Sequence, residues 1–440
     1  MELNIGIDDT DSKKGGCTTY VGARLVEKLE KNGVSFIDYP NIIRLNPNIP
    51  YKTRGNAAVA LRFRCEGSQH NAILETVLRE IEENSHWGRK DTEPAVVVLE
   101  GKPSLEVKRF SRSALFDVVP ESLAIRILRR CKACAAAYGG TLGLVGALAA
   151  VGETLEGDHT FELVAYRERR KCGTPRLVDE NSVKNMDKKT VPMTFNNYDY
   201  ESSRMLVTPH GPDPVLLGIR GETANVVLDA FRMLRIDEPV ERWVIFRTNH
   251  GTDAHLQTGE ARKRIEPDRP IVLRGIVIDS PRTIRGGHTF FTMDYGDGLI
   301  RCAAFEPTGL LQGAVTQLLP GDEITAFGGV RTHIGKLFTI NMEKMIVHHI
   351  VERLNSENPV CPRCGKHLKS VGLGQGFRCK RCSLLNPEAQ KRMTAAARSL
   401  GPGLYLPTLK AHRHLMKPQS RYGLEKSWDR TKPSGVWHNP

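Results

Sequence analysis

The chain has 440 residues, and its 63 lysine and arginine residues exceed its 50 aspartate and glutamate residues by a formal net charge of +13. This length is too great for one ordinary core and predicts about three domains of roughly 150 residues, or several smaller ones. The positive charge favours a polyanionic partner, nucleic acid first, although a basic solvated surface explains it equally well. The first residues lack a signal-peptide pattern, and no stretch approaches the roughly 18 unbroken apolar residues of a membrane span. We therefore expect a cytoplasmic protein without membrane association.

A strand, a polar loop and a helix are predicted at the start of the chain. LNIGID is typical of a buried strand, and CTTYVGARLVEKLEKNG has helical spacing that ends at Gly33. The loop between them holds Asp8, Asp9 and Asp11, whose charges repel one another unless cations hold them. The loop therefore predicts Mg²⁺, which usually arrives with nucleotide phosphates. A solvated turn whose aspartates cap the helix is the alternative.

The same stretch offers partners for those phosphates at the positive end of the predicted helix. The GxxxxGK[ST] spacing is absent, so the stretch is not a Walker loop. The phosphate-binding candidates are Lys13, Lys14, Gly15 and Gly16. The hydroxyl of Thr18, taken by itself, is typical of a helix cap.

A strand, helix and strand pattern then occurs twice. NAAVALRF, HNAILETVLREIEENS and EPAVVVLE form the first copy, and DPVLLGIRG, ETANVVLDAFRMLR and ERWVIFRTN the second. Two such halves make a ferredoxin-like α/β sandwich, which we assign to residues 54–100 plus 202–255. Because residues 1–53 are too few to bury a core, we expect them to join residues 101–201 in one discontinuous domain.

The small residues of GGTLGLVGALAAVG lie inside this intervening segment. Close helix packing is the commoner cause of such a pattern, and close approach of a phosphate is the alternative. Cys131 and Cys134 form a CxxC without a second pair nearby, so we interpret them as buried thiols.

Residues 270–350 have the pattern of an OB-fold β-barrel. Five short strands are separated by glycine turns, and TGLLQGAVTQLL lies between the third and the fourth. The second strand and the residues before it would stack bases and contact RNA. Strand alternation requires that one of Phe290 and Phe291 faces inward. The RNA-binding candidates are Arg282, Arg285, His288 and Phe290.

Two CxxC pairs separated by fourteen residues predict a zinc ribbon over residues 358–386. Cys361, Cys364, Cys379 and Cys382 would bind Zn²⁺ tetrahedrally, and free thiols are the alternative. Arg363 and Arg381 of its basic loops would contact phosphates. Residues 387–440 form a basic C-terminal tail that either contacts phosphates as well or is disordered.

The motifs GIDDTDS, GGCTT, KTRGN, LGLVGALAAVG and TPHGPDPVLLGIRG, together with the β-rich segment and the CxxC pairs, resemble one family. The chain is similar over essentially its whole length to the archaeal tRNA(Ile) agmatidine synthetases, TiaS. The resemblance implies a multidomain α+β protein with a kinase-like α/β catalytic domain at 1–53 plus 101–201, the ferredoxin-like sandwich, the OB-fold barrel and the zinc ribbon. It also implies ATP, Mg²⁺ and Zn²⁺ as cofactors, and agmatine and tRNA(Ile) with a CAU anticodon as partners. The oligomeric state stays open.

The implied reaction is ATP-dependent attachment of agmatine to the 2-oxo position of the wobble cytidine, which makes the tRNA decode AUA. Phosphorylation of the carbonyl oxygen creates a leaving group, and the agmatine amine displaces phosphate. Another ATP-dependent nucleic-acid-modifying enzyme is one alternative. A non-catalytic OB and zinc-ribbon binding protein is the other, and the aspartate loop argues against it.

The resemblance also assigns residues. Asp8, Asp9 and Asp11 would hold Mg²⁺ and position phosphates, one of them serving as a base. Thr18 would be autophosphorylated. From KTRGN, the resemblance adds Lys52, Arg54 and Asn56 to the nucleotide pocket. A guanidinium needs a carboxylate partner, and for agmatine we predict His210 and Asp213 in PHGPDPV.

Overall fold

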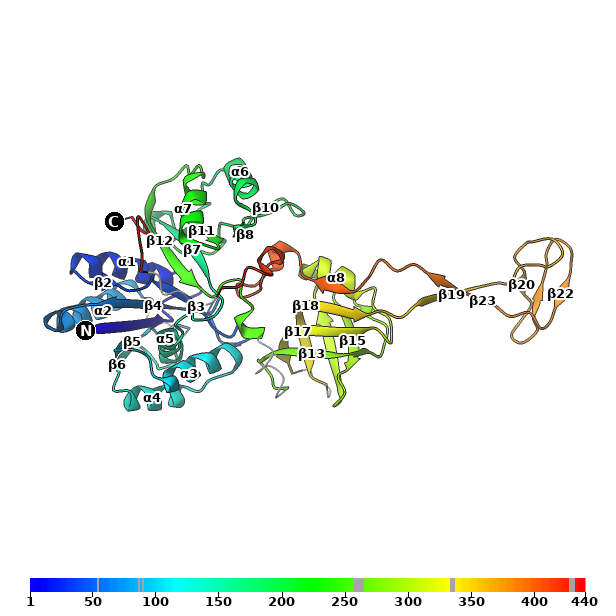
Figure 1. Cartoon of the computed structure of the whole chain (residues 1–440), viewed down its shortest axis with the longest axis horizontal. Coiled ribbons are helices and arrows are strands. Elements are labelled where there is room, and N and C mark those ends of the chain that lie inside the picture. Colours follow the sequence, from blue (N-terminus) through cyan, green and yellow to red (C-terminus); the bar gives the residue numbers. More distant parts are fainter. Residues whose placement is uncertain are drawn as a thin grey trace.

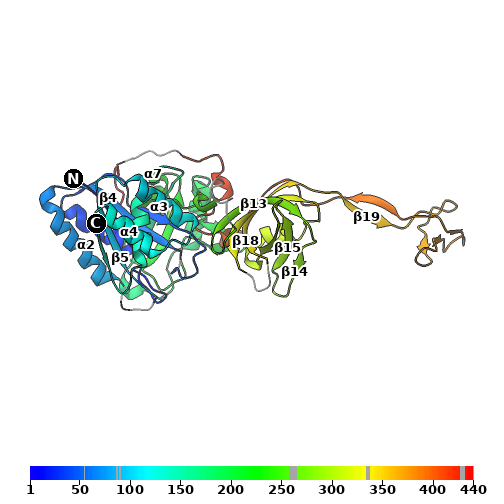
Figure 2. The same ribbon diagram turned by 90° about the horizontal axis from the view of Figure 1, so that it is seen from below.

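The computed structural model describes residues 1–53, 55–85, 88, 91–256, 265–332, 337–426 and 432–439. Its bodies follow one another along the long axis in Figure 1: a large sheet body, a β-barrel, and a small ribbon at the end of a thin arm. Figure 2 shows the same order after a quarter turn. Within the described residues, no helix has both the length and the apolar character needed to cross a membrane.

A ten-stranded sheet forms the large body. Its strands are β1 (Glu2–Asp8), β2 (Ser35–Phe36), β3 (Asn41–Arg44), β4 (Ala57–Arg64), β5 (Ala95–Glu100), β6 (Cys134–Ala137), β7 (Thr160–Arg167), β8 (Thr194–Phe195), β11 (Val215–Gly221) and β12 (Val240–Thr248). The spatial order is β6-β5-β1-β4-β3-β12-β7-β11-β8, with β2 beside β4. In the middle, β3 and β12 pair in parallel through only two residue pairs, whereas the neighbouring pairs are antiparallel. We call this junction the seam, because it joins two halves of one sheet.

Helices cover both faces of this sheet. They are α1 (Thr18–Lys31), α2 (His70–Asn84), α3 (Leu105–Phe116), α4 (Glu121–Arg130), α5 (Gly143–Gly152), α6 (Glu180–Thr190) and α7 (Ala224–Arg232). One hydrophobic core lies between the sheet and α1, α2, α6 and α7, and a second lies under α3, α4 and α5. As the helical spacing predicted, α1 buries Val21, Leu25 and Leu29.

The glycines of α5 serve close packing, as the small-residue pattern predicted. A Cβ added at Gly6 of β1 would overlap the carbonyl of Ala147 in α5. A Cβ at Gly146 would overlap the carboxylate of Asp8. The helix backbone therefore lies directly against the end of β1, where the aspartate loop begins.

The strand pairing differs from the expected grouping of residues 54–100 with 202–255. The strands of the first segment, β4 and β5, lie on either side of β1, and those of the second, β11 and β12, lie on either side of β7. The chain order β7-α6-β8-β11-α7-β12 with the spatial order β12-β7-β11-β8 is itself a ferredoxin-like arrangement, over residues 160–248. The sequence pattern shows that two strand-helix-strand units exist. Which strands pair with one another in the sheet depends on register and packing, which the pattern does not show.

The barrel has the predicted OB order. Its five strands are β13 (Pro270–Val277), β15 (Thr289–Asp294), β16 (Leu299–Ala304), β17 (Glu323–Arg331) and β18 (Thr339–His349). It closes because β13 pairs with both β15 and β17. Along the chain, the helix α8 (Leu310–Val315) lies between the third and fourth strands of the barrel. The short strand β14 (Arg282–Thr283) pairs antiparallel with β15.

Beyond the barrel, β19 (Arg353–Glu357) and β23 (Arg392–Ala396) form a two-stranded arm. It carries the ribbon, whose three short strands are β20 (Lys369–Ser370), β21 (Phe377–Arg378) and β22 (Leu385–Asn386). The remaining short elements are the hairpin β9 (Tyr198–Asp199) with β10 (Arg204–Met205) and 3₁₀ turns at Gly67–Gln69, Arg169–Lys171, Ala254–Leu256, Glu306–Thr308, Leu409–Ala411 and Gln419–Arg421.

The end of the chain is not a separate tail. From the arm it returns along the barrel, where β24 (Gly403–Tyr405) pairs with β18, and continues to the sheet body (Figure 1). There His438 forms a bridge with Val244 of β12, and Trp437 packs against Phe36 and Tyr39. We call residues 402–426 and 432–439 the C-terminal strap. Disorder, which was one of the two alternatives for the tail, does not hold for these residues, because the strap is packed against the barrel and the sheet body.

Candidate active site

A cavity of about 720 Å³ lies at the seam and is lined by both halves of the sheet body and by the strap. It brings together residues that the sequence placed in three separate motifs. These are Asp8, Asp9, Asp11, Lys13, Thr18, Lys52, Asn56, His210 and Asp213. Lys14 is exposed outside the lining, Gly15 closes the tight turn that begins at Ser12, Gly16 comes next in the chain, and Arg54 lies outside the described residues.

Asp8 is the last residue of β1, and Asp9 and Asp11 follow it in the loop. Asp9 has a φ of 54°, and its carboxylate accepts hydrogen bonds from the backbone of Glu93 at 2.7 Å and from Thr53 at 3.4 Å. Burial, together with the neighbouring carboxylate of Asp9, raises the pKa of Asp8 well above its usual range. Burial also raises the pKa of Asp9 to about 6. Carboxylates held in this way fit a divalent cation, because an added positive charge would stabilise their ionised forms.

The aspartates do not cap α1. The N-cap residue is Cys17, and its side chain makes no capping hydrogen bond. The alternative of a solvated turn with capping aspartates is therefore wrong.

Thr18, the first residue of α1, is only 4% exposed and lies beside the aspartate loop. Its hydroxyl accepts a hydrogen bond from the Thr10 hydroxyl at 3.1 Å and donates one to Asp11 Oδ1 at 3.4 Å. The hydroxyl is therefore in contact with a carboxylate that can accept its proton.

The loop predicted for agmatine forms part of the opposite wall. Asp213 is buried, and its carboxylate contacts the guanidinium of Arg176 at 3.2 Å and the backbone N–H of Val215 at 3.1 Å. Arg204 donates a hydrogen bond to the ring of His210. A guanidinium from a ligand would have to share Asp213 with Arg176.

A charged cluster that no sequence motif revealed lies in the cavity wall. Glu162 of β7 contacts Arg220 at 3.1 Å and His250 at 2.7 Å. Although burial alone would raise it, these two partners hold the pKa of Glu162 well below its usual range. Burial lowers the pKa of His250 to about 3, so the ring is neutral at pH 7. A single charged residue inside an apolar strand carries no recognisable motif, so no local signal pointed to Glu162.

The strap forms a further part of the cavity wall that the sequence did not reveal. Lys410, His412, Arg413 and His414 all line the cavity. Arg413 also contacts Glu343 of the barrel at 2.9 Å and donates to Asn48 of the sheet body at 3.2 Å. A basic segment that looked like a tail thus connects the cavity to the barrel.

The RNA-binding candidates lie outside the cavity. On the barrel, Phe291 is in the core and Phe290 is half-buried, as strand alternation required. His288 packs edge-on against Phe305 at 5.2 Å, and Arg282 faces Phe290 across β14 and β15. Arg285 on the barrel and Arg363 and Arg381 on the ribbon are exposed.

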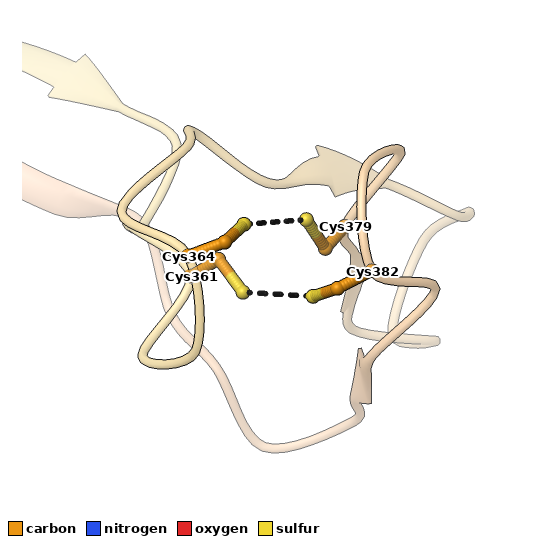
Figure 3. A group of neighbouring side chains, drawn as sticks. All are labelled: Cys361, Cys364, Cys379 and Cys382. Atoms are coloured by element: carbon orange, nitrogen blue, oxygen red, sulfur yellow. Dashed lines mark hydrogen bonds between the residues drawn. The ribbon is translucent and has the colours of Figure 1, made fainter.

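The ribbon cysteines converge on one point (Figure 3). Their four sulfur atoms lie within 4.8 Å of one another, with Cys361 and Cys382 at 3.5 Å and Cys364 and Cys379 at 3.4 Å. Four thiolates around Zn²⁺ at about 2.3 Å would have sulfur atoms just under 4 Å apart. The cluster therefore fits a closed structural zinc site rather than four unrelated thiols.

A cavity with an acidic loop, joined to an OB barrel and a zinc ribbon, defines a multidomain enzyme of nucleic-acid modification. Three family models match the chain: the TiaS TCKD domain at residues 4–140, the TiaS FLD domain at 141–255 and the TiaS C-terminal zinc ribbon domain at 358–400. Residues 1–3, the barrel segment 256–357 and residues 401–440 lie outside these matched ranges.

Complete proteins match as well. The chain is 39% identical to the isoleucine-tRNA 2-agmatinylcytidine synthetase TiaS of Staphylothermus marinus, over 99% of this chain and 98% of that one. A solved complex of TiaS with an isoleucine tRNA and ATP matches with a TM-score of 0.87 and 38% identity, covering 96% of this chain and 97% of that one. A complex of TiaS with the tRNA, AMPCPP and agmatine matches with a TM-score of 0.84, 36% identity and the same coverage. The chain belongs to the TiaS family of isoleucine-tRNA 2-agmatinylcytidine synthetases, which confirms the resemblance.

Proposed function

We propose that this protein conjugates agmatine to the 2-oxo position of the wobble cytidine in the CAU anticodon of tRNA(Ile), at the expense of ATP. The product tRNA decodes AUA. The observation that carries the proposal is the cavity at the seam, because it joins the aspartate loop to the Asp213 loop. Family membership supports it, since solved TiaS structures are named as complexes with an isoleucine tRNA, ATP, an ATP analogue and agmatine.

The reaction needs two bond exchanges. In the first, a P–O bond of ATP breaks and the carbonyl oxygen of cytidine bonds to the phosphoryl group. In the second, the agmatine amine bonds to C2, the C2–O bond breaks, phosphate leaves and the amine loses a proton. The protein's part in the first step is positioning and charge compensation, which account for most of phosphoryl-transfer catalysis.

Asp8, Asp9 and Asp11 would hold Mg²⁺, which compensates phosphate charge when bound. Asp11 already contacts the Thr18 hydroxyl at 3.4 Å, so it is the base best placed for autophosphorylation of Thr18. The nucleotide-binding residues that we propose around them are Lys13, Lys14, Gly15, Gly16, Lys52, Arg54 and Asn56.

For agmatine, Asp213 is the proposed carboxylate, with His210 beside it. For tRNA, we propose the outer face of the barrel around Phe290 and the exposed arginines of the zinc-bearing ribbon. The barrel residues are Arg282, Arg285, His288 and Phe290, and the ribbon residues are Arg363 and Arg381. The cytoplasm is the compartment that we propose, because it holds the tRNA pool.

The test incubates the full chain with ATP, Mg²⁺, labelled agmatine and tRNA transcripts that differ only in the anticodon. Label should enter only the CAU transcript. Label in every transcript would favour another nucleic-acid-modifying enzyme, and label in none would contradict the proposal.

Asp11→Asn should reduce incorporation at least about tenfold. Its matched control is Asp229→Asn, because Asp229 is exposed on α7 away from the cavity. Unchanged ATP turnover in the Asp11 variant would instead favour a non-catalytic binding protein.

Autophosphorylation has a separate test. Intact-mass analysis after incubation with ATP should show one added phosphate on the wild type and none on Thr18→Ala. Thr76→Ala, on the exposed side of α2, serves as the control and should gain the phosphate. An unchanged wild-type mass would exclude the role of Thr18.

A further inference from the structure

Arg44, the last residue of β3, lies in the cavity wall at the seam. Its backbone is fixed on both sides by Asn249, which accepts a hydrogen bond from the Arg44 N–H and donates one to its carbonyl, both at 2.9 Å. The guanidinium reaches over Gly55, where an added Cβ would overlap it. The backbone and this glycine therefore hold the side chain in one place.

The guanidinium has few partners for a buried cation. Within the described part of the chain it donates one long hydrogen bond, from Nη1 to the carbonyl of Gly55 at 3.3 Å, and it has no carboxylate within 4 Å. Its Nε is buried and has no hydrogen-bond partner among the described residues. A buried guanidinium usually satisfies most of its five N–H groups, so this one is prepared for an acceptor that comes from outside the protein.

The neighbours of Arg44 do not neutralise it. Glu162 is the nearest group of opposite charge in the cluster, but it is already paired with Arg220 and His250. His414 of the strap lies beside Arg44 over Gly55 and stacks on His250, with ring centroids 4.7 Å apart. Burial lowers the pKa of both histidines, so both rings are neutral at pH 7. Two arginines therefore share one paired carboxylate, while Asp11 acts on Arg44 more weakly than Glu162 does, and the remaining positive charge favours an anion.

The chemistry of that anion follows from the charges that line the cavity. The three carboxylates of the aspartate loop would need a cation before they could accept phosphate, whereas the guanidinium of Arg44 can accept an anion by itself. Agmatine, which carries positive charge at both ends, is disfavoured next to two arginines. A phosphoryl group that is being transferred to RNA fits this place, because a guanidinium can contact two of its oxygens at once.

We propose that Arg44 binds the anionic oxygens of the phosphoryl group while that group bonds to the cytidine carbonyl oxygen. This assignment rests on the function proposed above. His414 acts as a positioning residue, because it closes the space behind Arg44 and prevents the guanidinium from turning away. The strap thereby contributes to the reaction although it reaches the cavity from the far end of the sequence.

The experiment compares full-length wild type, Arg44→Gln, Arg44→Lys and the control Arg232→Gln. Arg232 lies on α7, 61% exposed, and pairs only with Asp229 in the described structure. Each protein is incubated with Mg²⁺, ATP labelled in the γ-phosphate and a CAU transcript, without agmatine. The measured quantity is RNA-bound phosphate plus transcript-dependent phosphate release. Arg44→Gln should lower it about 100-fold, and Arg232→Gln should leave it unchanged.

A second measurement shows whether Arg44 contacts the phosphates of the nucleotide or the phosphoryl group that is transferred to RNA. The affinity for AMPCPP should change less than about threefold in Arg44→Gln, because the proposal assigns Arg44 to the transferred phosphoryl group and the residues around the aspartate loop to the nucleotide. An equal loss of AMPCPP affinity would assign Arg44 to the nucleotide and overturn the proposal. A wild-type rate of phosphorylation in Arg44→Gln would also overturn it.

Arg44→Lys tests the proposal if the glutamine variant does not fold. Lysine keeps the charge but contacts the anion at a point, so the loss should be smaller than for glutamine and still measurable, about tenfold.

Inorganic phosphate provides a readout that a purely structural role would not change. It should inhibit the wild type in competition with the transcript and inhibit Arg44→Lys more weakly, and equal inhibition of both would count against the assignment. If the wild type itself neither phosphorylates the transcript nor incorporates agmatine, the proposed function fails first. If it does both and the Arg44 variants match it, only this inference fails.

Discussion

Arg421 of the strap is the strongest single anchor between the end of the chain and the sheet body. Its side chain is fully buried and contacts Asp158 at 2.9 and 3.0 Å, Glu222 at 2.5 Å and the carbonyl of Gly251. We predict that Arg421→Met, which keeps the length of the side chain and removes its charge, destabilises the protein substantially.

The size of this loss in the free energy of unfolding depends on the cations that remain near Asp158 and Glu222. Removing one member of a buried ion pair costs about 3 to 5 kcal/mol, because it leaves the other charge buried without compensation. Here Lys417 lies 3.5 Å from Asp158 and Lys426 lies 2.7 Å from Glu222, so both carboxylates keep a second cation. We therefore expect a loss near the lower end, about 3 kcal/mol.

The assay is urea unfolding followed by circular dichroism and tryptophan fluorescence, with Arg232→Met as the exposed control. The double variant Arg421→Met with Glu222→Gln should be more stable than Arg421→Met alone, since it removes a buried carboxylate that has lost one of its two cations. A loss below about 1 kcal/mol for Arg421→Met would refute the reasoning. It would mean that the strap rests on the sheet body without being held by these charges.

Three further predictions concern the zinc site, a buried histidine and a thiol in the cavity. Cys379→Ser should reduce bound zinc from one equivalent to none by elemental analysis, while the unfolding of the sheet body stays unchanged because the ribbon lies far from it (Figure 1); retention of full zinc would contradict the site. Burial lowers the pKa of His159 to about 4. An unfolded histidine takes up its proton near 6.5, so the stability that the wild type has over His159→Gln should shrink by about 3 kcal/mol as the pH falls from 6.5 to 4, and a pH-independent difference in unfolding free energy would be the contrary result. Burial also raises the pKa of Cys17 to about 11. At pH 8 iodoacetamide should therefore label Cys17 on the order of 100-fold more slowly than an ordinary exposed cysteine. Peptide mass spectrometry measures this, and labelling as fast as at Cys134, which is exposed on β6 and not buried as its CxxC spacing suggested, would refute it.

The parts of the molecule that the sequence predicted well are local. The aspartate loop, the five barrel strands and the ribbon cysteines each occupy a short stretch whose spacing determines its geometry. Family resemblance then identified motifs such as the Asp213 loop, which the structure places in the same cavity as Asp8.

The parts that escaped prediction depend on contacts between distant segments. Arg44 and Glu162 sit in ordinary strands, and only the pairing of β3 with β12 and of β12 with β7 brings them to one cavity. The strap looked like a solvated tail because its charge is basic, yet Arg421 pairs with carboxylates about 200 and 260 positions earlier. Composition shows the charge of a segment but not its partner.

The strap also gives the enzyme an order of assembly. Ribosomes add about 5 to 20 residues per second, so the first 401 residues of the chain take roughly 20 to 80 s to synthesise before the strap can follow. During that time the cavity lacks one wall, and Asp158 and Glu222 lack Arg421. We therefore expect a copy whose synthesis stops before the strap to be less active and less stable, and more readily cut by proteases. Dependence on the strap restricts activity on the tRNA pool to copies that have been synthesised through the strap.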